Sequence, residues 1–300
     1  MLDPEIILGI VDNSLKRNAV FGDLLPPESK ASLVKNSLIR FAETGQILCR
    51  QGQDDNALFL VIDGEFEVST ESNGRTTSLG KLGPGELIGE IAALFLIPRI
   101  ATVTATRPSA VLEIPCEIFS ELLAENPAIR AAVNKRSRNR VVETSLRCVP
   151  IFNDLDAQPF GELCYLSSVV KAKKNEVIVR EGGTERSMYV ICSGTARVYI
   201  TVDGKEINIS LLRPGDYFGE YALLTGEPRS ASVSALTDLQ LVLLEGEALQ
   251  SFIDYYNNVE NQLKLNTLLR KQSLDLMHDS LVTRQTAETR LKNFQNIPSR

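Results

Sequence analysis

The chain has 300 residues, and its apolar content (43%) and charged content (23%) are those of an ordinary globular protein of about two domains. The net charge of −6 argues against a nucleic-acid partner, and no apolar stretch approaches the roughly 18 residues that a transmembrane helix requires. A single histidine, His278, and five scattered cysteines without a C-x-x-C pair leave almost no material for multi-histidine metal sites or for Ser–His and Cys–His catalytic pairs.

The N-terminus and the cysteines predict a cytoplasmic location. Residues 1–5 lack the basic start and the apolar run of a secretory signal. An odd number of widely separated cysteines is typical of reduced, buried thiols. We expect a protein that is not an enzyme, needs no cofactor or metal, and contacts neither DNA nor a membrane.

In chain order, the pattern predicts a helical segment, two similar β domains joined by a helix, and a helical tail. Residues 58–62 and 188–192 are short apolar runs, and alternating segments follow at 65–68 and 197–200. Asn73-Gly74 and Asp203-Gly204 predict hairpin turns, whose central residues need positive φ. The predicted boundaries are 1–20 for the N-terminal helical segment, 21–127 for the first domain, 128–150 for the linker helix, 151–253 for the second domain and 254–300 for the tail.

The two domains are copies of one unit at a constant offset of 130 residues. The matches run without insertion from Gly52 and Gly182 to Arg99 and Arg229, since 182 − 52 and 229 − 99 both equal 130. Gly45 and Asn175 also correspond, and both residue types tolerate a left-handed backbone. Many short strands with glycine-rich turns predict a β-roll or jelly roll in each copy.

The most similar stretch is residues 89–103, repeated at 219–233. A glycine that opens a short helical turn exposes backbone N–H groups that suit a phosphate, and the arginine nine residues after the glutamate can offer two parallel donors to it. The glutamate is an acceptor and suits a sugar hydroxyl. One such pattern alone would indicate a surface ion pair, but two at identical spacing predict two ligand sites. Their residues are Gly89, Glu90, Ile91, Ala92, Arg99, Ile100 and Ala101, and Gly219, Glu220, Tyr221, Ala222, Arg229, Ser230 and Ala231.

Each stretch resembles the phosphate-binding cassette of cyclic-nucleotide-binding domains, commonly written F-G-E-x-A-L…P-R-x-A-[ST]-V. The second copy matches nearly throughout from Phe218, whereas the first has Ile88 and Ala93 at two cassette positions. The resemblance covers roughly residues 21–253. The tandem arrangement is most similar to regulatory subunits of cAMP-dependent protein kinase and to the regulatory half of cGMP-dependent protein kinase.

The resemblance implies a mainly β fold with flanking helices (α+β), made of two tandem eight-stranded β-rolls with connecting and C-terminal helices. It implies that Glu90 and Glu220 accept from the ribose 2′-hydroxyl and that Arg99 and Arg229 pair with the cyclic phosphate. Backbone amides near residues 91–92 and 221–222 would complete each phosphate site. The implied function is a cyclic-nucleotide receptor whose conformational change regulates an effector such as a protein kinase catalytic subunit or domain.

The base preference is indicated by the residue after each arginine. In eukaryotic kinases a hydroxyl there accompanies cGMP and an alanine accompanies cAMP. Ile100 offers no hydroxyl, and Ser230 does, although bacterial cAMP receptors also carry serine at this position. We therefore expect cAMP to be favoured over cGMP. The first copy also has an apolar loop, 95–97, where the second has Thr225-Gly226-Glu227.

Several alternatives stay open. The same fold could bind a nucleoside or another small phosphate, or serve as a scaffold without a ligand. In the tail, Tyr255 or Tyr256 could cap the base by stacking, or the helix could simply pack on the second roll. Self-association through residues 265–294 is equally open. The basic cluster at 135–140 is either a solvated face of the linker helix or a contact for a partner.

Overall fold

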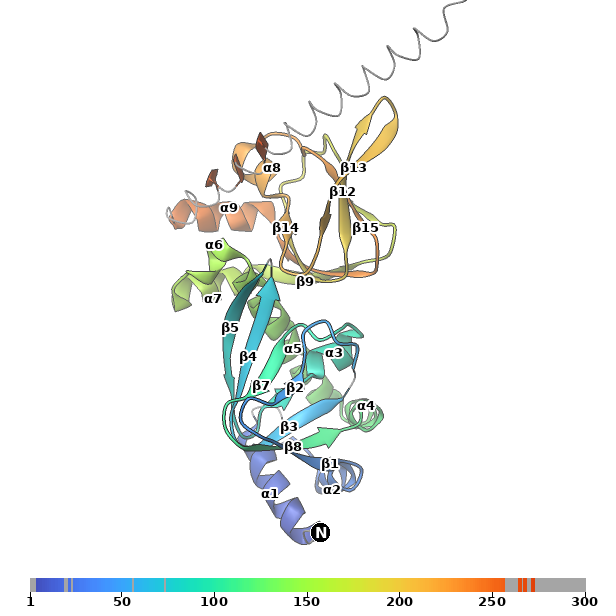
Figure 1. The fold of residues 1–300 in the computed structure, drawn as a ribbon, viewed down its shortest axis with the longest axis vertical. Coiled ribbons are helices and arrows are strands. Elements are labelled where there is room, and N and C mark those ends of the chain that lie inside the picture. The colour runs from blue at the N-terminus through green and yellow to red at the C-terminus, as the bar shows by residue number, and fades with distance from the viewer. Residues whose placement is uncertain are drawn as a thin grey trace, which may run out of the picture. The chain divides into compact units, whose positions relative to one another are not determined.

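The computed structural model describes residues 4–18, 21–22, 24–55, 57–72, 74–256, 264–265, 267–268 and 271–272. It divides the chain into two compact units, Met1–Cys148 and Val149–Arg300. Figure 1 labels the elements of both. No helix in these described ranges is long and apolar enough to cross a membrane.

The first unit begins with two helices, continues with eight short strands and ends in two further helices. Its helices are α1 (Pro4–Arg17), α2 (Pro27–Lys35), α3 (Glu90–Phe95), α4 (Cys116–Glu125) and α5 (Pro127–Cys148). Its strands are β1 (Leu38–Ala42), β2 (Ile47–Cys49), β3 (Leu58–Asp63), β4 (Phe66–Ser72), β5 (Arg75–Leu82), β6 (Leu87–Ile88), β7 (Thr102–Ala105) and β8 (Ser109–Ile114).

The second unit has the same order of elements up to its last strand, which one named helix, α9, follows. Its helices are α6 (Pro150–Asn153), α7 (Ala157–Tyr165), α8 (Glu220–Thr225) and α9 (Gly246–Tyr255). Its strands are β9 (Ser167–Ala172), β10 (Val177–Val179), β11 (Met188–Ser193), β12 (Ala196–Val202), β13 (Lys205–Leu212), β14 (Tyr217–Phe218), β15 (Ser232–Ala235) and β16 (Leu239–Leu244).

The sheets confirm the predicted fold class. In the first unit the strand orders are β1-β8-β3-β6 and β2-β7-β4-β5. In the second they are β9-β16-β11-β14 and β10-β15-β12-β13, so every strand is replaced by the one numbered eight higher. All pairings are antiparallel in both units. The sequence repeat is therefore a repeat of topology.

The turns adopt the predicted backbone. Asp203 and Gly204 have φ of 51° and 75° and connect β12 to β13, where Val202 pairs with Lys205. Gly45 and Asn175 have φ of 81° and 70°. Asp and Asn reach this left-handed region more readily than other residues with a side chain, which explains why Asn175 can stand where the first copy has Gly45. Asn73 lies outside the described residues.

The central strand β3 is apolar from Leu58 to Ile62 because both of its faces are covered there. Phe59 and Val61 point into the roll, against the second sheet. Leu58 and Leu60 point the opposite way, into a cluster with side chains of α1, α2, α4 and α5. A strand buried on both faces reads as a continuous apolar run rather than an alternating one. This packing holds β6 in place, and the first cassette follows directly after β6.

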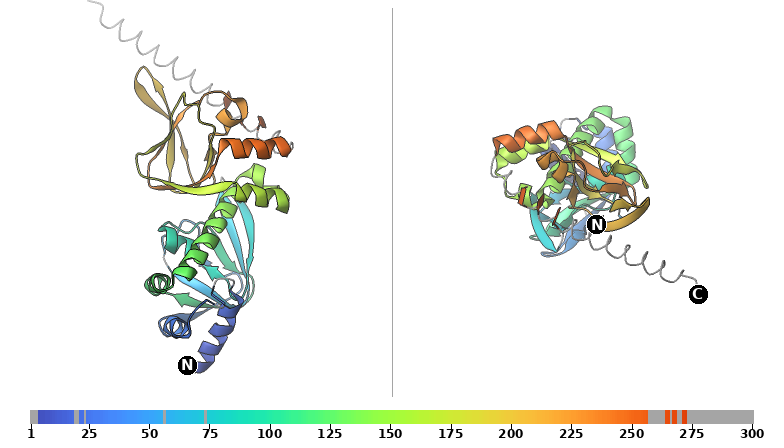
Figure 2. Two further views of the ribbon diagram at one scale, coloured as in Figure 1. Left: turned by 180° about the vertical axis from the view of Figure 1, so that it is seen from behind. Right: turned by 90° about the horizontal axis from the view of Figure 1, so that it is seen from above.

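Two helices follow the first roll, and the second of them, α5, occupies the region predicted as the linker helix, 128–150. Helix α4 ends just before Pro127, whose missing N–H is tolerated at the first position of α5. Helix α5 then runs along the outside of the first roll, as Figure 2 shows from behind. It buries Ile129, Val133, Val141 and Leu146. The polar face of this helix is thereby brought to the cassette.

The C-terminal tail differs from an unbroken helix. Helix α9 ends at Tyr255, and Tyr256 has φ −108° and ψ 76°, outside the helical region. Residues 264–265, 267–268 and 271–272 are helical again. His278 and most of the stretch 265–294 lie outside the described residues, so self-association through it stays a prediction.

Candidate ligand-binding sites

The second cassette is built around Gly219, a position where any side chain would displace the neighbouring residues. Gly219 follows β14, has φ of 92° and begins α8. A Cβ atom added there would lie 2.5 Å from the NH1 nitrogen of Arg229 and against the carbonyl oxygen of Ser187. The absence of a side chain lets the guanidinium lie directly on the backbone.

Arg229 is buried, with 4% of its surface exposed. Its NH1 donates to the carbonyl of Gly219 and its NH2 to that of Ser187, each at 2.7 Å. Its Nε is buried and has no hydrogen-bond partner among the described residues. Burial lowers the pKa of Arg229, and the charges of Tyr189, Glu185 and Glu220 oppose this. A buried cation with an unsatisfied donor is a site for an anion.

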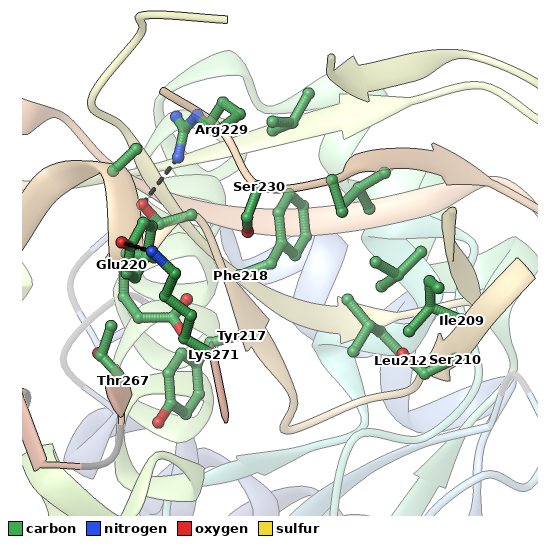
Figure 3. A pocket seen from close by; sticks show the side chains of 17 residues that line it. Ile209, Ser210, Leu212, Tyr217, Phe218, Glu220, Arg229, Ser230, Thr267 and Lys271 are labelled. Carbon is green, nitrogen blue, oxygen red and sulfur yellow. Dashed lines mark hydrogen bonds between the residues drawn. The ribbon is translucent and has the colours of Figure 1, made fainter. Parts of the chain in front are cut away.

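A cavity of about 430 Å³ opens beside this arginine. One side is apolar and formed by Val179, Val198, Ile209, Leu212 and Val233, while the other carries the cassette. Figure 3 shows Glu220 and Arg229 at one end and Ile209, Ser210 and Leu212 at the other. All seven residues predicted for this site line the cavity: Gly219, Glu220, Tyr221, Ala222, Arg229, Ser230 and Ala231. An apolar wall with a few convergent polar groups is the usual form of a small-molecule site.

The first cassette has the same construction. Gly89, with φ of 90°, begins α3, and an added Cβ would collide with Arg99 NH1. Arg99 is buried, and its NH2 donates to the carbonyl of Ala57 at 2.5 Å and lies 3.4 Å from Asp55 Oδ2. Its Nε and NH1 are buried without a hydrogen-bond partner among the described residues. Asp55 and Glu185, which acts on Arg229, are also 130 residues apart.

The remaining residues predicted for the first site lie in α3 and directly after this arginine. Ile91 and Ala92 form the first turn of α3 after Glu90, and Ala92 is buried. Ile100 and Ala101 follow Arg99 and are half-buried. At the end of α3, Leu96 is 82% exposed with φ of 53°, where the second copy has Gly226 at 72°. The apolar loop of the first copy therefore keeps the backbone path of the glycine loop.

Comparison with known proteins assigns the family. Residues 39–126 and 169–256 each match the family model described as "Cyclic nucleotide-binding domain". The chain belongs to this family. It carries two cyclic-nucleotide-binding domains in tandem, as its sequence predicts.

Its relatives include a protein kinase regulatory subunit and a protein kinase. The chain is 27% identical over 240 residues to a cAMP-dependent protein kinase regulatory subunit of Yarrowia lipolytica, covering 80% of this chain and 60% of the relative. It is 31% identical over 227 residues to a cGMP-dependent protein kinase of Toxoplasma gondii, covering 75% of this chain and 21% of the relative. Among solved structures, the regulatory domain of Toxoplasma gondii PKA with cAMP has 25% identity and a TM-score of 0.41, over 89% of this chain and 98% of that one. The chain thus spans less than two thirds of the length of these curated relatives.

The first cyclic-nucleotide-binding domain receives two arginines from α5. Arg140 NH1 donates to Glu90 Oε1 at 2.8 Å and to the carbonyl of Leu87 at 2.9 Å. Arg140 NH2 and Arg136 NH2 lie 3.3 and 3.4 Å from Glu86 Oε1. Part of the basic cluster therefore holds the cassette rather than facing solvent. The spacing of Arg136 and Arg140 could have indicated this contact, because residues four apart lie on one face of a helix.

The predicted base caps lie elsewhere. Tyr255 is 79% exposed, and the Tyr256 hydroxyl donates to Glu162 Oε2 on α7 at 3.0 Å. Neither residue lines the cavity. Helix α9 ends at Tyr255, and the Tyr256 ring packs against Phe252. Among the described residues after α9, Thr267 and Lys271 do line the cavity. Sequence reasoning missed both, since neither is aromatic.

Proposed function

We propose that this protein is a cytoplasmic cyclic-nucleotide receptor, selective for cAMP over cGMP, that regulates a protein kinase catalytic subunit or domain and is not itself an enzyme. The observation that carries the proposal is the buried arginine in each cassette, with donors left over for an anion. A scaffold without a ligand has no use for two such arginines. A kinase as the partner is supported by the relatives, which are a cAMP-dependent protein kinase regulatory subunit and a cGMP-dependent protein kinase.

The second site offers a complementary group for each part of a cyclic nucleotide. Arg229 and the backbone of the first turn of α8 face the phosphate, and Glu220 accepts from the ribose 2′-hydroxyl. The apolar wall of β12, β13 and β15 takes the base. A phosphate ligand rather than a nucleoside is favoured because Arg229 would otherwise stay buried without a counter-charge among its hydrogen-bond partners.

In the first domain, Arg140 couples ligand binding to helix α5. A ribose hydroxyl that donates to Glu90 joins the same carboxylate that accepts from Arg140. Ligand then stabilises the position of α5 against the cassette, and the position of α5 in turn raises ligand affinity. Both effects arise from one coupling free energy. A change that weakens the contact between α5 and the cassette must therefore also lower the affinity for the ligand.

Arg140→Met is expected to weaken cAMP binding at the first site by about tenfold, since it leaves the buried Glu90 carboxylate without this charge-assisted bond. Isothermal titration calorimetry would measure both sites. Arg138→Met removes the same charge from an exposed position on the same helix and is expected to leave both sites unchanged. Equal effects of the two variants would refute the coupling through Glu90.

The proposal itself is tested by titrating nucleotide-free protein with cAMP and then with cGMP in a calorimeter. Two binding events with cAMP, and weaker ones with cGMP, are the expected result. Adenosine and guanosine serve as neutral competitors. Folded, ligand-free protein that binds a nucleoside but neither cyclic nucleotide would overturn the assignment of the ligand. If none of the four compounds binds, the result would support a scaffold without a ligand.

A further inference from the structure

The cavity of the second domain contains a cation that belongs to neither the cassette nor the β-roll. Lys271, in the C-terminal segment, lines the cavity together with Thr267. Its Nζ lies 4.4 Å from the centroid of the Tyr221 ring and donates to the Tyr221 hydroxyl. Tyr221 directly follows Glu220 in the first turn of α8. Lys271 therefore contacts the turn whose backbone faces the ligand.

The first domain offers a parallel built from a different residue. Subtracting the repeat offset, 271 − 130 equals 141, one position from Arg140. In both domains, then, the chain that follows the β-roll brings a basic side chain onto the first turn of the cassette. In the first domain the arginine reaches Glu90. In the second, the lysine reaches Tyr221, whose counterpart Ile91 has no ring to receive a cation.

The charge arrangement of the second cavity gives this lysine a function. Arg229 already donates from NH1 and NH2 to two carbonyl oxygens. A lysine is a point charge that attracts an anion without needing bidentate geometry, and a half-buried position weakens its screening by solvent. Figure 3 shows Lys271 on the same side of the cavity as Glu220, next to the cassette.

We infer that Lys271 is a ligand-selecting residue of the second site, which adds positive charge to the cavity and so favours a cyclic phosphate over the neutral nucleoside. The inference rests on the proposed function and deepens it. The cation–π contact with Tyr221 positions the ammonium at the cavity. A lysine that served only to fasten the C-terminal segment would act equally on charged and neutral ligands.

The test is Lys271→Met, which keeps an apolar stem of similar length and removes the charge. Second-site affinities for cAMP and for adenosine are measured by calorimetry in the full chain, with the second-site event assigned by its loss in Arg229→Lys. We expect cAMP binding to weaken about three- to tenfold and adenosine binding to stay constant. The dependence of cAMP affinity on salt should also become shallower, because one attractive charge has been removed.

Two further variants serve as controls. Lys271→Arg keeps the charge, so this variant is expected to bind cAMP with near wild-type affinity. Lys264→Met removes an exposed charge from the same segment, away from the cavity, and is expected to change nothing. An unchanged cAMP affinity and salt dependence in Lys271→Met, or an equal loss for both ligands, would overturn the inference. Failure of the wild-type protein to bind cAMP at all would instead refute the proposed function.

Discussion

Arg229→Lys is expected to weaken cAMP binding at the second site by about 100-fold or more, with the first site unchanged. The guanidinium satisfies the carbonyls of Gly219 and Ser187 and still has a donor to spare. A lysine at this position cannot reproduce that planar set of donors, so either the carbonyls or the phosphate lose their partner. Losing charge-assisted bonds in a buried site costs about 3 kcal/mol, which is the expected 100-fold.

Calorimetry that resolves the two binding events is the measurement. Arg213→Lys makes the same substitution at an exposed position directly after β13 and should leave both events intact. Arg99→Lys should produce the mirror result, with loss of the first event only. If Arg229→Lys bound cAMP as the wild type does, the phosphate would have to be held by other groups.

Gly89→Ala is expected to abolish binding at the first site and to destabilise the first domain by about 3 kcal/mol. Two effects add at this position. The backbone has φ of 90°, a conformation that costs a residue with a side chain about 1 kcal/mol or more. The added Cβ would also collide with Arg99 NH1 and lie 2.8 Å from the carbonyl oxygen of Ala57. Arg99 must then move, and a buried guanidinium that moves gives up its bond to Ala57.

Gly74→Ala separates the two effects. Gly74 has φ of 76°, but an added Cβ would meet no atom within 4 Å. It should therefore lower stability by only about 1 kcal/mol and leave cAMP affinity unchanged. Urea unfolding and calorimetry on both variants give the comparison. Equal stability losses, or retained first-site binding in Gly89→Ala, would show that the close contact between Arg99 and the glycine is unimportant.

Much of the architecture was readable from local sequence, because it depends on backbone preferences. A constant offset of 130 residues identified the duplication, and residues such as Asp203-Gly204 and Asn175 marked turns that only a few residue types tolerate. Pro127 stands at the first position of α5, where a proline is tolerated. The cassette residues were found for a similar reason: Gly89 and Gly219 are required by the backbone, and each arginine stands at a fixed short distance from its glycine.

The sequence by itself thus determined the two β-rolls and the two cassettes. Their constraints act over short stretches, and the same pattern occurs in both copies of the repeat. Only the tertiary structure decided which distant side chains contact each cassette. Arg140 meets Glu90 from fifty residues away, and Lys271 meets Tyr221 at the same separation, where tyrosines 255 and 256 were expected. Such contacts depend on where a helix ends and which face it buries against its own roll. Packing sets both, and no local preference along the chain encodes them.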